Sequence, residues 1–434
     1  MKKTLKAATF VLLSLLLVFI TACSKESGGE KVSKDGEIII RFPHMYVGTD
    51  PHAEWFNKVV EDFNNEHKGK IKVVTEEIAG EQNYVDKMKL LLQSDELPDI
   101  GMSPQGLLDI AYEAGKTVDL TPYLEENPEF KEQFDPASME VNTFDGEVHG
   151  LPNFKGLIGY FYNKTLFEKA GIDAPAKTWD ELFEQFETLK ASGITPLSLD
   201  TAETGWITSL WFNAMIGSSG SEGLEFMNTY FPTDFNKPYI VDALTKVQTM
   251  LQDYTTQDAI GAKYDTAAMH FLNGETAMIA NGPWMIGDFD DPAKAKEGLA
   301  EEVGVALFPE QTVFDTPEKG FYILSQDKEH QDAAFEFLKE LVSPERQYEM
   351  LLLKGELPDS PKVEITDEVK EKYPVLADFL VQAKDAENRI LYYQKTWYNN
   401  VTNEVSNIYP ALANGQLTPE EAAKKLTEAS LKNE

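Results

Sequence analysis

The chain has one cysteine, Cys23, among 434 residues, so it can form no internal disulfide and its stability must come from packing. It also lacks the motifs of common catalytic sites: there is no serine nucleophile elbow, no zinc-binding HExxH and no phosphate loop. His44 and His52 have no third ligand at a spacing that completes a metal site. Internal repeats are missing too, which disfavours a structural adhesin. The sequence therefore implies no metal and no cofactor.

Basic residues are few. Lysine and arginine together number 39 against 73 acidic residues, and the formal net charge is -34 at pH 7. Such an acidic chain is a poor partner for nucleic acid or another polyanion, which proteins bind through lysine and arginine. The charge says little about a small neutral ligand. Apolar residues make up 42% of the chain, which suffices for real cores, and the length indicates two domains or more.

The N-terminus resembles a lipoprotein signal peptide. Lys2, Lys3 and Lys6 precede an apolar stretch at residues 10–20 that is too short to favour a spanning helix. Residues 20–23, ITAC, resemble a lipobox in which Cys23 becomes the lipidated first residue, carrying palmitate. We expect residues 1–22 to be the signal peptide and residues 23–36 a flexible tether. The protein would be lipid-anchored on the extracytoplasmic face of a cell membrane, and the lack of disulfides favours a Gram-positive cell.

The segment FLNGETAMIANGPW at residues 271–284 combines a helix end, a buried strand and an aromatic side chain. Gly274 tolerates the left-handed conformation that ends helices, and residues 277–280 form an apolar run typical of a buried strand. Gly282 and Pro283 stop the strand, so Trp284 follows its carboxyl end, where open α/β sheets place a ligand crevice. An indole there can stack on an apolar ring face, and burial in the core is the alternative.

The order of the predicted elements indicates an α/β fold. Residues 36–42 and 71–75 are predicted as buried strands, with an amphipathic helix at 53–65 between them. This β-α-β unit makes the sheet at least partly parallel, and a third strand is expected to begin at residue 100. The loops at the carboxyl ends of these strands, residues 44–52, 81–82 and 103–105, should face one crevice.

Later segments carry further strand and helix signals. Strands are predicted at residues 157–162, 194–199, 303–308 and 320–325. Thr178 and Thr418 each precede a glutamate by three positions, which indicates capping boxes at two helix starts. Ser343 should cap a helix that begins at Pro344, and another helix is expected over residues 397–412.

Seven segments in register resemble family 1 of the bacterial extracellular solute-binding proteins, the maltose-binding-protein-like receptors of ABC importers. They are LPDI (97–100), HGLP (149–152), YFYNKTLFEKAGI (160–172), KTWDEL (177–182), FLNGETAMIANGPW (271–284), GELP (355–358) and ANGQLTPEEAA (413–423). These segments run over nearly the whole chain after the signal peptide. Residues 42–51 and 200–235 match no pattern of the family, and they lie where specificity would be set.

The resemblance implies an α/β fold of the type II periplasmic-binding-protein kind, in which two hinged lobes close on a ligand like a Venus flytrap. Lobe I would hold residues 37–152 and 321–355, and lobe II residues 153–320 and 356–434. The crossings fall in extended or Gly-Pro sequence, which can absorb hinge rotation. The ligand would lie between the lobes, as small-molecule sites often do.

Sugar recognition requires flat aromatic side chains for C–H faces and planar polar groups for hydroxyls. Trp284 aligns with the stacking position of the family, and Trp397 is a weaker match to its second aromatic. Trp206 and Trp211 follow the strand at 194–199; their separation puts them on different helix faces, so we expect Trp206 to face the ligand and Trp211 to be core. Further candidates at loops, strand ends or crossings are Tyr46, Tyr322, His44, Glu81, Gln105, Asn153 and Lys155; for the polar ones a solvated loop side chain is the alternative.

The resemblance implies a monomeric receptor without catalysis. It would hand a sugar, expected to be an oligosaccharide, to membrane permease subunits that work with a separate ATPase. The first alternative is a receptor for another solute, such as a polyamine, a metal chelate or a phosphorylated compound. The second is a surface glycoside hydrolase, which needs two carboxylates flanking the scissile bond; no segment singles out such a pair.

Overall fold

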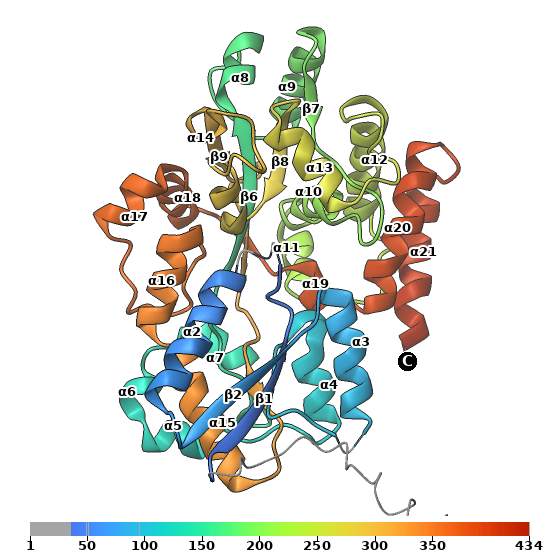
Figure 1. The fold of residues 1–434 in the computed structure, drawn as a ribbon. Coiled ribbons are helices and arrows are strands. Elements are labelled where there is room, and N and C mark those ends of the chain that lie inside the picture. Colours follow the sequence, from blue (N-terminus) through green and yellow to red (C-terminus); the bar gives the residue numbers. More distant parts are fainter. Residues whose placement is uncertain (1–35, 49, 51, 95, 434) are drawn as a thin grey trace, which may run out of the picture.

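The computed structural model describes residues 36–48, 50, 52–94 and 96–433, and these form two lobes with separate hydrophobic cores (Figure 1). One core contains buried side chains from Ile40 to Leu151 and again from Phe321 to Met350. The other contains those from Leu157 to Phe314 and from Leu351 onward. We call the two bodies lobe I and lobe II. Both combine helices with sheet, so the predicted two-lobe α/β fold is confirmed. The predicted signal peptide, the tether up to residue 35 and Cys23 lie outside the described residues.

Lobe I is the lower body in Figure 1. Its elements are β1 (Ile38–His44), α2 (Ala53–Glu66), β2 (Ile71–Glu77), α3 (Glu81–Leu92), β3 (Ile100–Gly101), η1 (Pro104–Gly106), α4 (Leu107–Glu113), α5 (Thr121–Glu126), α6 (Pro128–Lys131), α7 (Pro136–Val141), β4 (Thr143–Phe144), β5 (Glu147–Val148), β11 (Tyr322–Ile323), α15 (Lys328–Leu341) and α16 (Pro344–Lys354). Strands β1 and β2 pair in parallel from Ile38 opposite Ile71 to His44 opposite Glu77, which confirms the predicted β-α-β unit.

The third predicted strand is much shorter than the first two. β3 has two residues and pairs antiparallel with β11, which itself spans only part of the strand predicted at residues 320–325. The Tyr322 ring occupies the space beside Gly101, where an added Cβ would lie 2.5 Å from the ring. A glycine at this position therefore lets the two strands and the aromatic side chain share one layer of the core.

Lobe II is the upper body. Its elements are β6 (Gly156–Asn163), α8 (Lys164–Ala170), α9 (Trp179–Ala191), β7 (Thr195–Leu197), α10 (Trp206–Gly217), α11 (Ser221–Met227), α12 (Pro238–Asp253), α13 (Tyr264–Leu272), β8 (Thr276–Asn281), η2 (Pro283–Asp288), α14 (Leu299–Glu302), β9 (Val303–Ala306), β10 (Thr312–Thr316), α17 (Asp367–Lys372), α18 (Pro374–Lys384), β12 (Asn388–Ile390), α19 (Tyr393–Thr396), α20 (Asn399–Ala413), α21 (Pro419–Ser430) and η3 (Leu431–Asn433). Its sheet has the order β12-β10-β6-β8-β7, with β9 also paired to β6.

Local sequence signals located several of these elements. The capping boxes at Thr178 and Thr418 are both present, and Ser343 Oγ accepts the backbone N–H of Arg346 as a helix cap should. Strands β10 and β12 had no counterpart in the sequence analysis because they are short and irregular in composition. The helix expected from residue 397 instead begins at Asn399, after an extended Trp397.

Three chain segments pass between the lobes and lie side by side. Leu151 and Phe321 exchange backbone hydrogen bonds of 2.9 and 3.0 Å, and Phe154 forms a bridge with Pro358. The third passage involves α16, whose two faces pack on different cores: Met350 on that of lobe I and Leu351 on that of lobe II. Short strands between lobes can absorb hinge rotation, whereas α16 supplies a stiff strut.

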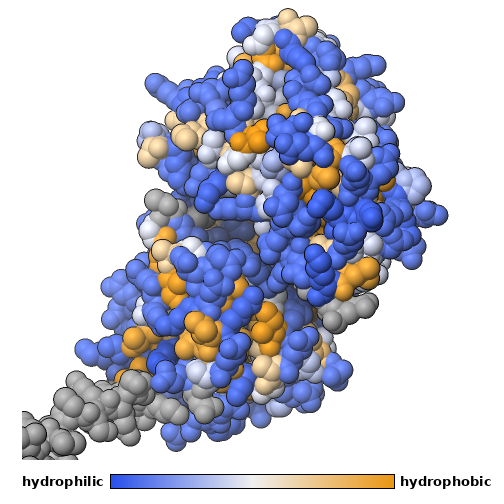
Figure 2. Space-filling view, turned by 90° about the vertical axis from the view of Figure 1, so that its right-hand side faces the viewer, coloured by the Kyte–Doolittle hydropathy of each residue, from blue (hydrophilic) through white to orange (hydrophobic). Residues whose placement is uncertain are grey.

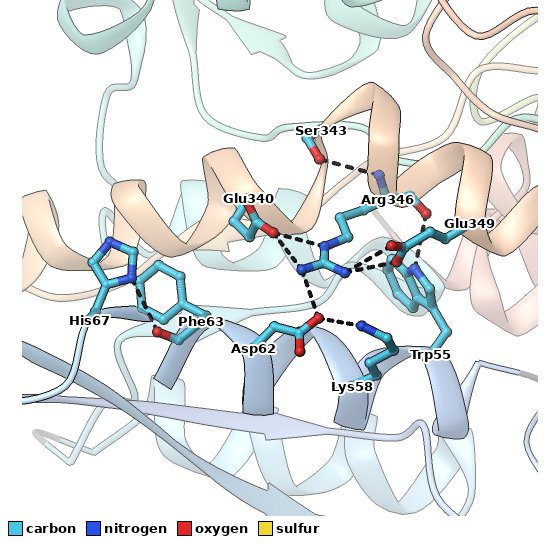
Figure 3. A network of polar contacts seen from close by, with 9 residues as sticks. All are labelled: Trp55, Lys58, Asp62, Phe63, His67, Glu340, Ser343, Arg346 and Glu349. Atoms are coloured by element: carbon cyan, nitrogen blue, oxygen red, sulfur yellow. Dashed lines mark hydrogen bonds and ion pairs between the residues drawn. The ribbon is translucent and has the colours of Figure 1, made fainter. Parts of the chain in front are cut away.

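Arg346 at the start of α16 ties this strut to α2 and α15. Its guanidinium lies 3.0 Å from Asp62, 2.7 Å from Glu340 and 2.8 Å from Glu349, and the residue is 9% exposed (Figure 3). Its backbone carbonyl accepts the indole N–H of Trp55. One cation therefore holds three carboxylates from three helices together.

Replacing Arg346 with methionine is expected to lower the free energy of unfolding by about 1–2 kcal/mol, because the three carboxylates then repel one another while their partial exposure screens the effect. Lys58→Met is the control, since Lys58 pairs with Asp62 alone and is 60% exposed. Urea unfolding followed by circular dichroism measures both. An equal loss in the two variants contradicts the proposed role of Arg346.

Candidate functional site

A cleft with a volume of about 1040 Å³ lies between the lobes. Figure 2 shows the two bodies of the molecule one above the other. The volume is at the upper end of the range for small-molecule sites. Its lining draws on both lobes, so a molecule in it contacts lobe I and lobe II together.

The wall from lobe I consists of loops at strand ends. Met45, Tyr46 and His52 follow β1, Glu81 and Gln82 follow β2, and Met102 to Gln105 follow β3; all line the cleft. The prediction that these loops face one crevice is confirmed for residues 45, 46 and 52, for residues 81–82 and for residues 103–105, whereas His44 does not line the cleft. Within this wall the Tyr46 ring stacks on His52 at 4.6 Å, and the Gln105 amide donates to Glu81 Oε1 at 2.8 Å.

The wall from lobe II is aromatic. Trp284 lies in η2, directly after β8, and Trp206 opens α10; both are half-buried and line the cleft. Their ring centroids are 6.1 Å apart and their planes are inclined by 54°. The indole N–H of Trp206 donates to the Tyr392 hydroxyl. Trp211, on the other hand, is fully buried. Of these two tryptophans, Trp206 therefore lies at the cleft as expected, and its contact with a ligand stays a prediction.

Buried polar contacts fix the position of Trp206. The carboxylate of Asp200 accepts the backbone N–H groups of Trp206 at 3.0 Å and of Thr208 at 3.2 Å, and so caps the first turn of α10. Burial raises the pKa of Asp200 to about 7, although these backbone donors oppose the shift. The start of α10 is thus anchored beneath the cleft surface.

Gly282 sets the orientation of Trp284. An added Cβ at Gly282 would lie 2.3 Å from the outer edge of the indole, so the ring lies flat against a backbone position that has no side chain. Because an indole can swing on χ1 and χ2, a methyl group at Gly282 would displace the ring and not the strand.

Gly282→Ala is expected to weaken ligand binding about tenfold by moving the Trp284 ring. Calorimetric titration of the variant measures the loss. In a Trp284→Ala background the same glycine substitution should have no further effect, because the ring that it displaces is gone. Additive losses in the double variant would show that Gly282 acts independently of Trp284.

Two buried polar side chains that line the cleft carry atoms without a hydrogen bond. Neither side-chain atom of Asn153 is hydrogen-bonded although the residue is 4% exposed, and Glu356 Oε2 also lacks a hydrogen bond at 7% exposure. Both residues line the cleft. Buried polar atoms without a partner are costly, and here they face a space in which a ligand can satisfy them.

The carboxyl group of Glu356 has an unusual environment. Burial raises its pKa to about 7; nearby His52 opposes the shift, and the charges of Glu318 and Asp50 add to it. His52 Nε2 lies 3.8 Å from Glu356 Oε2, so this pair joins lobe I to lobe II across the floor.

Each lysine in the cleft is already paired with carboxylates. Lys155 lies 3.5 Å from Asp135 and 3.6 Å from Asp315, and Lys395 lies 2.9 Å from Glu318. Lys319 pairs with Asp109. Burial alone would lower the pKa of Lys395, but Glu318 and other acids outweigh it and raise the pKa. No lysine among the described cleft residues is left to neutralise an anionic ligand.

Three of the residues predicted to bind ligand lie outside the cleft, and the structure gives no support to that role. His44 is fully buried against Phe42 and Phe56 because β1 extends two residues beyond the predicted strand. Tyr322 is fully buried beside Gly101 in lobe I. Trp397 is 2% exposed and packs on Phe212, Phe226 and Phe235 in the core of lobe II, since it precedes α20 and does not project from it.

The other seven predicted residues come together around one space. Trp284, Trp206, Tyr46, Glu81, Gln105, Asn153 and Lys155 all line the cleft. Sequence reasoning missed Glu356, Tyr392 and Lys395. The signal for Glu356 was present, because a charged residue directly after the expected crossing at residue 355 must lie near the cleft floor. Tyr392 and Lys395 follow β12, which had not been predicted.

Other kinds of site find no support in the described part of the chain. Within it, no three histidine, cysteine or acidic side chains are grouped so that they could hold a metal ion. Likewise, among the described residues no helix has the length and apolar character needed to cross a membrane.

Comparisons with known proteins agree with this architecture. The multiple sugar-binding protein of Streptococcus mutans is 26% identical over 324 residues, which cover 71% of this chain and 70% of that protein. The xylose/arabinose-binding protein of Haloferax volcanii is 26% identical over 189 residues, 42% of this chain and only 40% of the relative. A solved chitin oligosaccharide binding protein has the same fold, with a TM-score of 0.81 at 22% identity over 91% of this chain and 98% of that one.

Residues 58–376, well over half of the chain, match the family described as bacterial extracellular solute-binding protein. The members of that family are receptors, which agrees with a cleft that holds aromatic and hydrogen-bonding groups. The protein is a bacterial extracellular solute-binding protein with a maltose-binding-protein-like fold, and not an enzyme.

Proposed function

We propose that the protein captures a neutral carbohydrate, an oligosaccharide, between its lobes and delivers it to the permease of an ABC importer. The observation that carries this proposal is the pair of indoles, Trp206 and Trp284, in a cleft that also holds the buried carboxyl group of Glu356 and the amide of Asn153, which has no hydrogen bond. Indole faces stack on the C–H faces of a sugar ring. An amide and a carboxyl group bind its hydroxyls in the plane of the ring.

The charge pattern favours a neutral ligand over a phosphorylated one. Lys155, Lys319 and Lys395 are paired with carboxylates, so a phosphate would have to displace them from Asp315, Asp109 or Glu318. The names of the relatives, which refer to multiple sugars, xylose or arabinose, and chitin oligosaccharide, also support a carbohydrate.

Ligand capture would proceed by closure of the lobes. The carbohydrate contacts both walls only when the cleft is closed, so it binds the closed form better and shifts the population toward it. An affinity in the micromolar range corresponds to about -8 kcal/mol, which two stacked rings and several hydrogen bonds can supply. The closed form would then offer a surface made from both lobes to the permease, which works with a separate ATPase.

The hinge and the anchor complete the proposal. We place lobe I at residues 37–152 and 321–355 and lobe II at residues 153–320 and 356–434, a division that the two separate cores support. The receptor would be a monomer on the outer face of a Gram-positive membrane, held through a lipid on Cys23. Cys23→Ser should release it into the medium; retention on the membrane would contradict the anchor.

The test of ligand class is calorimetric. Purified protein is titrated with malto-, xylo- and chito-oligosaccharides and, in parallel, with spermidine and glycerol 3-phosphate. We expect micromolar binding of at least one sugar series and none of the charged compounds. Binding of spermidine or glycerol 3-phosphate alone would replace the carbohydrate by that solute. Turnover of a chromogenic glycoside would contradict a receptor without catalysis.

A further inference from the structure

Tyr230 and Phe231 are the two aromatic side chains with exposed surfaces in the described part of the chain. They are 45% and 48% exposed, whereas the remaining aromatics there are buried or half-buried. The two residues are neighbours in the loop between α11 and α12, within the region 200–235 that matches no family pattern. Adjacent exposed aromatics on one short loop are costly in water and so indicate a binding surface.

The loop that carries these rings is firmly held on both sides. The Asn228 side chain accepts the N–H of Leu391 at 3.0 Å and donates to the carbonyl of Arg389 at 3.1 Å. Further along, Ser430 Oγ donates to the carbonyl of Thr233 at 2.9 Å, and Phe235 is fully buried. The exposed rings are therefore presented by a fixed backbone, so binding a ligand costs little ordering entropy.

Phe231 adopts a backbone conformation that bulky residues avoid. Its φ is 55°, in the left-handed region, which glycine and asparagine adopt much more readily than phenylalanine does. The N–H of Phe231 donates to the carbonyl of Thr396 at 2.6 Å, and its ring lies 4.9 Å from that of Tyr398 at an inclination of 31°. The unfavourable conformation turns the ring outward beside Tyr398. Strain of this kind is typical of functional positions.

The loop that carries Tyr230 and Phe231 lies beside a segment of the cleft wall. Thr396, which binds Phe231, directly follows Lys395, and Lys395 lines the cleft together with Tyr392 and Gln394. Burial and the charges of Asp109 and Glu140 raise the pKa of Tyr230, and the charge of Lys395 opposes them. The hydrogen bond from Phe231 to Thr396 places the loop beside the segment that lines the cleft. Figure 1 places α11 and α19 at this junction.

We propose that Tyr230 and Phe231 form an outer carbohydrate subsite, so that the ligand is an oligosaccharide whose far end leaves the cleft and stacks on these rings. This inference rests on the carbohydrate function proposed above and adds a chain length to it. Trp206 and Trp284 would hold the inner sugar units, and Tyr230 with Phe231 the outer one. A mono- or disaccharide would fill only the cleft.

The test is a ladder of oligosaccharides of two to five units from the series that binds, titrated calorimetrically into the wild type, Tyr230→Ala and Phe231→Gly. The glycine accepts the positive φ, so this variant should fold. Leu90→Ala is the control, because Leu90 is 66% exposed and does not line the cleft. Thermal unfolding checks that all four proteins are folded.

For the wild type and Leu90→Ala we expect affinity to rise about tenfold or more at one step of the ladder. Tyr230→Ala and Phe231→Gly should lose that step and bind the shorter sugars as the wild type does. A uniform loss over all lengths, or an unchanged step, would overturn the outer subsite while leaving the receptor function intact. If no sugar of any length binds, the carbohydrate function itself falls, and the subsite with it.

Discussion

Replacing Trp284 with alanine is expected to weaken carbohydrate binding by about 30- to 1,000-fold, the range found when a central aromatic anchor is truncated. The indole is one of two among the described cleft residues, and its removal also exposes the backbone at Gly282, against which the ring now lies. Because Trp284 is half-buried and packs at the edge of the core, its loss should cost less in stability than in affinity. Calorimetric titration with the best sugar of the screen measures the first effect, and thermal unfolding the second.

Trp397→Phe provides the matched control. Both tryptophans were candidates on sequence grounds, but Trp397 is buried in lobe II with an indole nitrogen that has no hydrogen-bond partner. We expect Trp397→Phe to leave the dissociation constant within about twofold of the wild-type value and to change only the unfolding temperature. Loss of affinity in Trp397→Phe together with full affinity in Trp284→Ala would contradict the stacking role of Trp284 and assign that role to Trp397.

The contrast between these two residues shows what local sequence can settle. Trp284 follows an apolar run that ends in Asn-Gly-Pro, so the sequence predicts both the strand and the point where it ends. A residue directly after a strand's carboxyl end lies near the crevice of an α/β sheet. Trp397 lies between two helices, and its direction depends on where α20 begins. A shift of two residues in that start moved the indole from the cleft into the core.

His44 illustrates a related limit. The sequence placed it in a loop because Pro43 precedes it, yet β1 continues through Pro43 to His44, with its last pairs against Glu76 and Glu77. Strand β1 has β2 on one side, and a proline is tolerated where its missing N–H is not needed for pairing. The alternation of the strand then turns His44 toward Phe42 and Phe56. Registers of this kind are set by tertiary contacts that no single sequence window contains.

The cleft floor could be predicted only in part, because it is made where distant segments meet. Asn153 was identified from its crossing, and the third crossing was placed at residue 355, but the burial of Glu356 depends on contacts with residues far from it in sequence. Its neighbours His52, Asp50 and Glu318 come from the loop after β1 and from the segment before β11. Electrostatic environments of buried groups arise from such assemblies, so a pKa shift is rarely readable from one motif.

In the wild type, the free energy of unfolding is expected to fall as the pH rises, because Glu356 is buried. In Glu356→Gln this fall should be absent. Burial raises the pKa of Glu356 from 4.5 to about 7 in the folded protein. Below pH 4.5 the carboxyl group is protonated in both states, and its contribution to stability is complete. Between pH 4.5 and 7 the unfolded chain gives up the proton while the folded protein keeps it, so the unfolding free energy falls. Above pH 7 the deficit is about 3 kcal/mol.

Unfolding in urea at pH 5 and pH 8 gives the change in unfolding free energy of each protein between the two pH values. The effect of Glu356 is the difference between the change in the variant and the change in the wild type. Asp200 and Asp359, whose pKa values are raised to about 7 and about 6, act in the same direction in both proteins and cancel in the comparison. The glutamine variant should lose about 2.5 kcal/mol less than the wild type between the two pH values, because part of the effect already falls below pH 5. Glu81→Gln, a change at an exposed position of the opposite wall, should behave as the wild type does. An equal loss in Glu356→Gln and the wild type would mean that Glu356 is ionised in the folded protein already at pH 5. Its ion pair with His52 would then outweigh the cost of its burial.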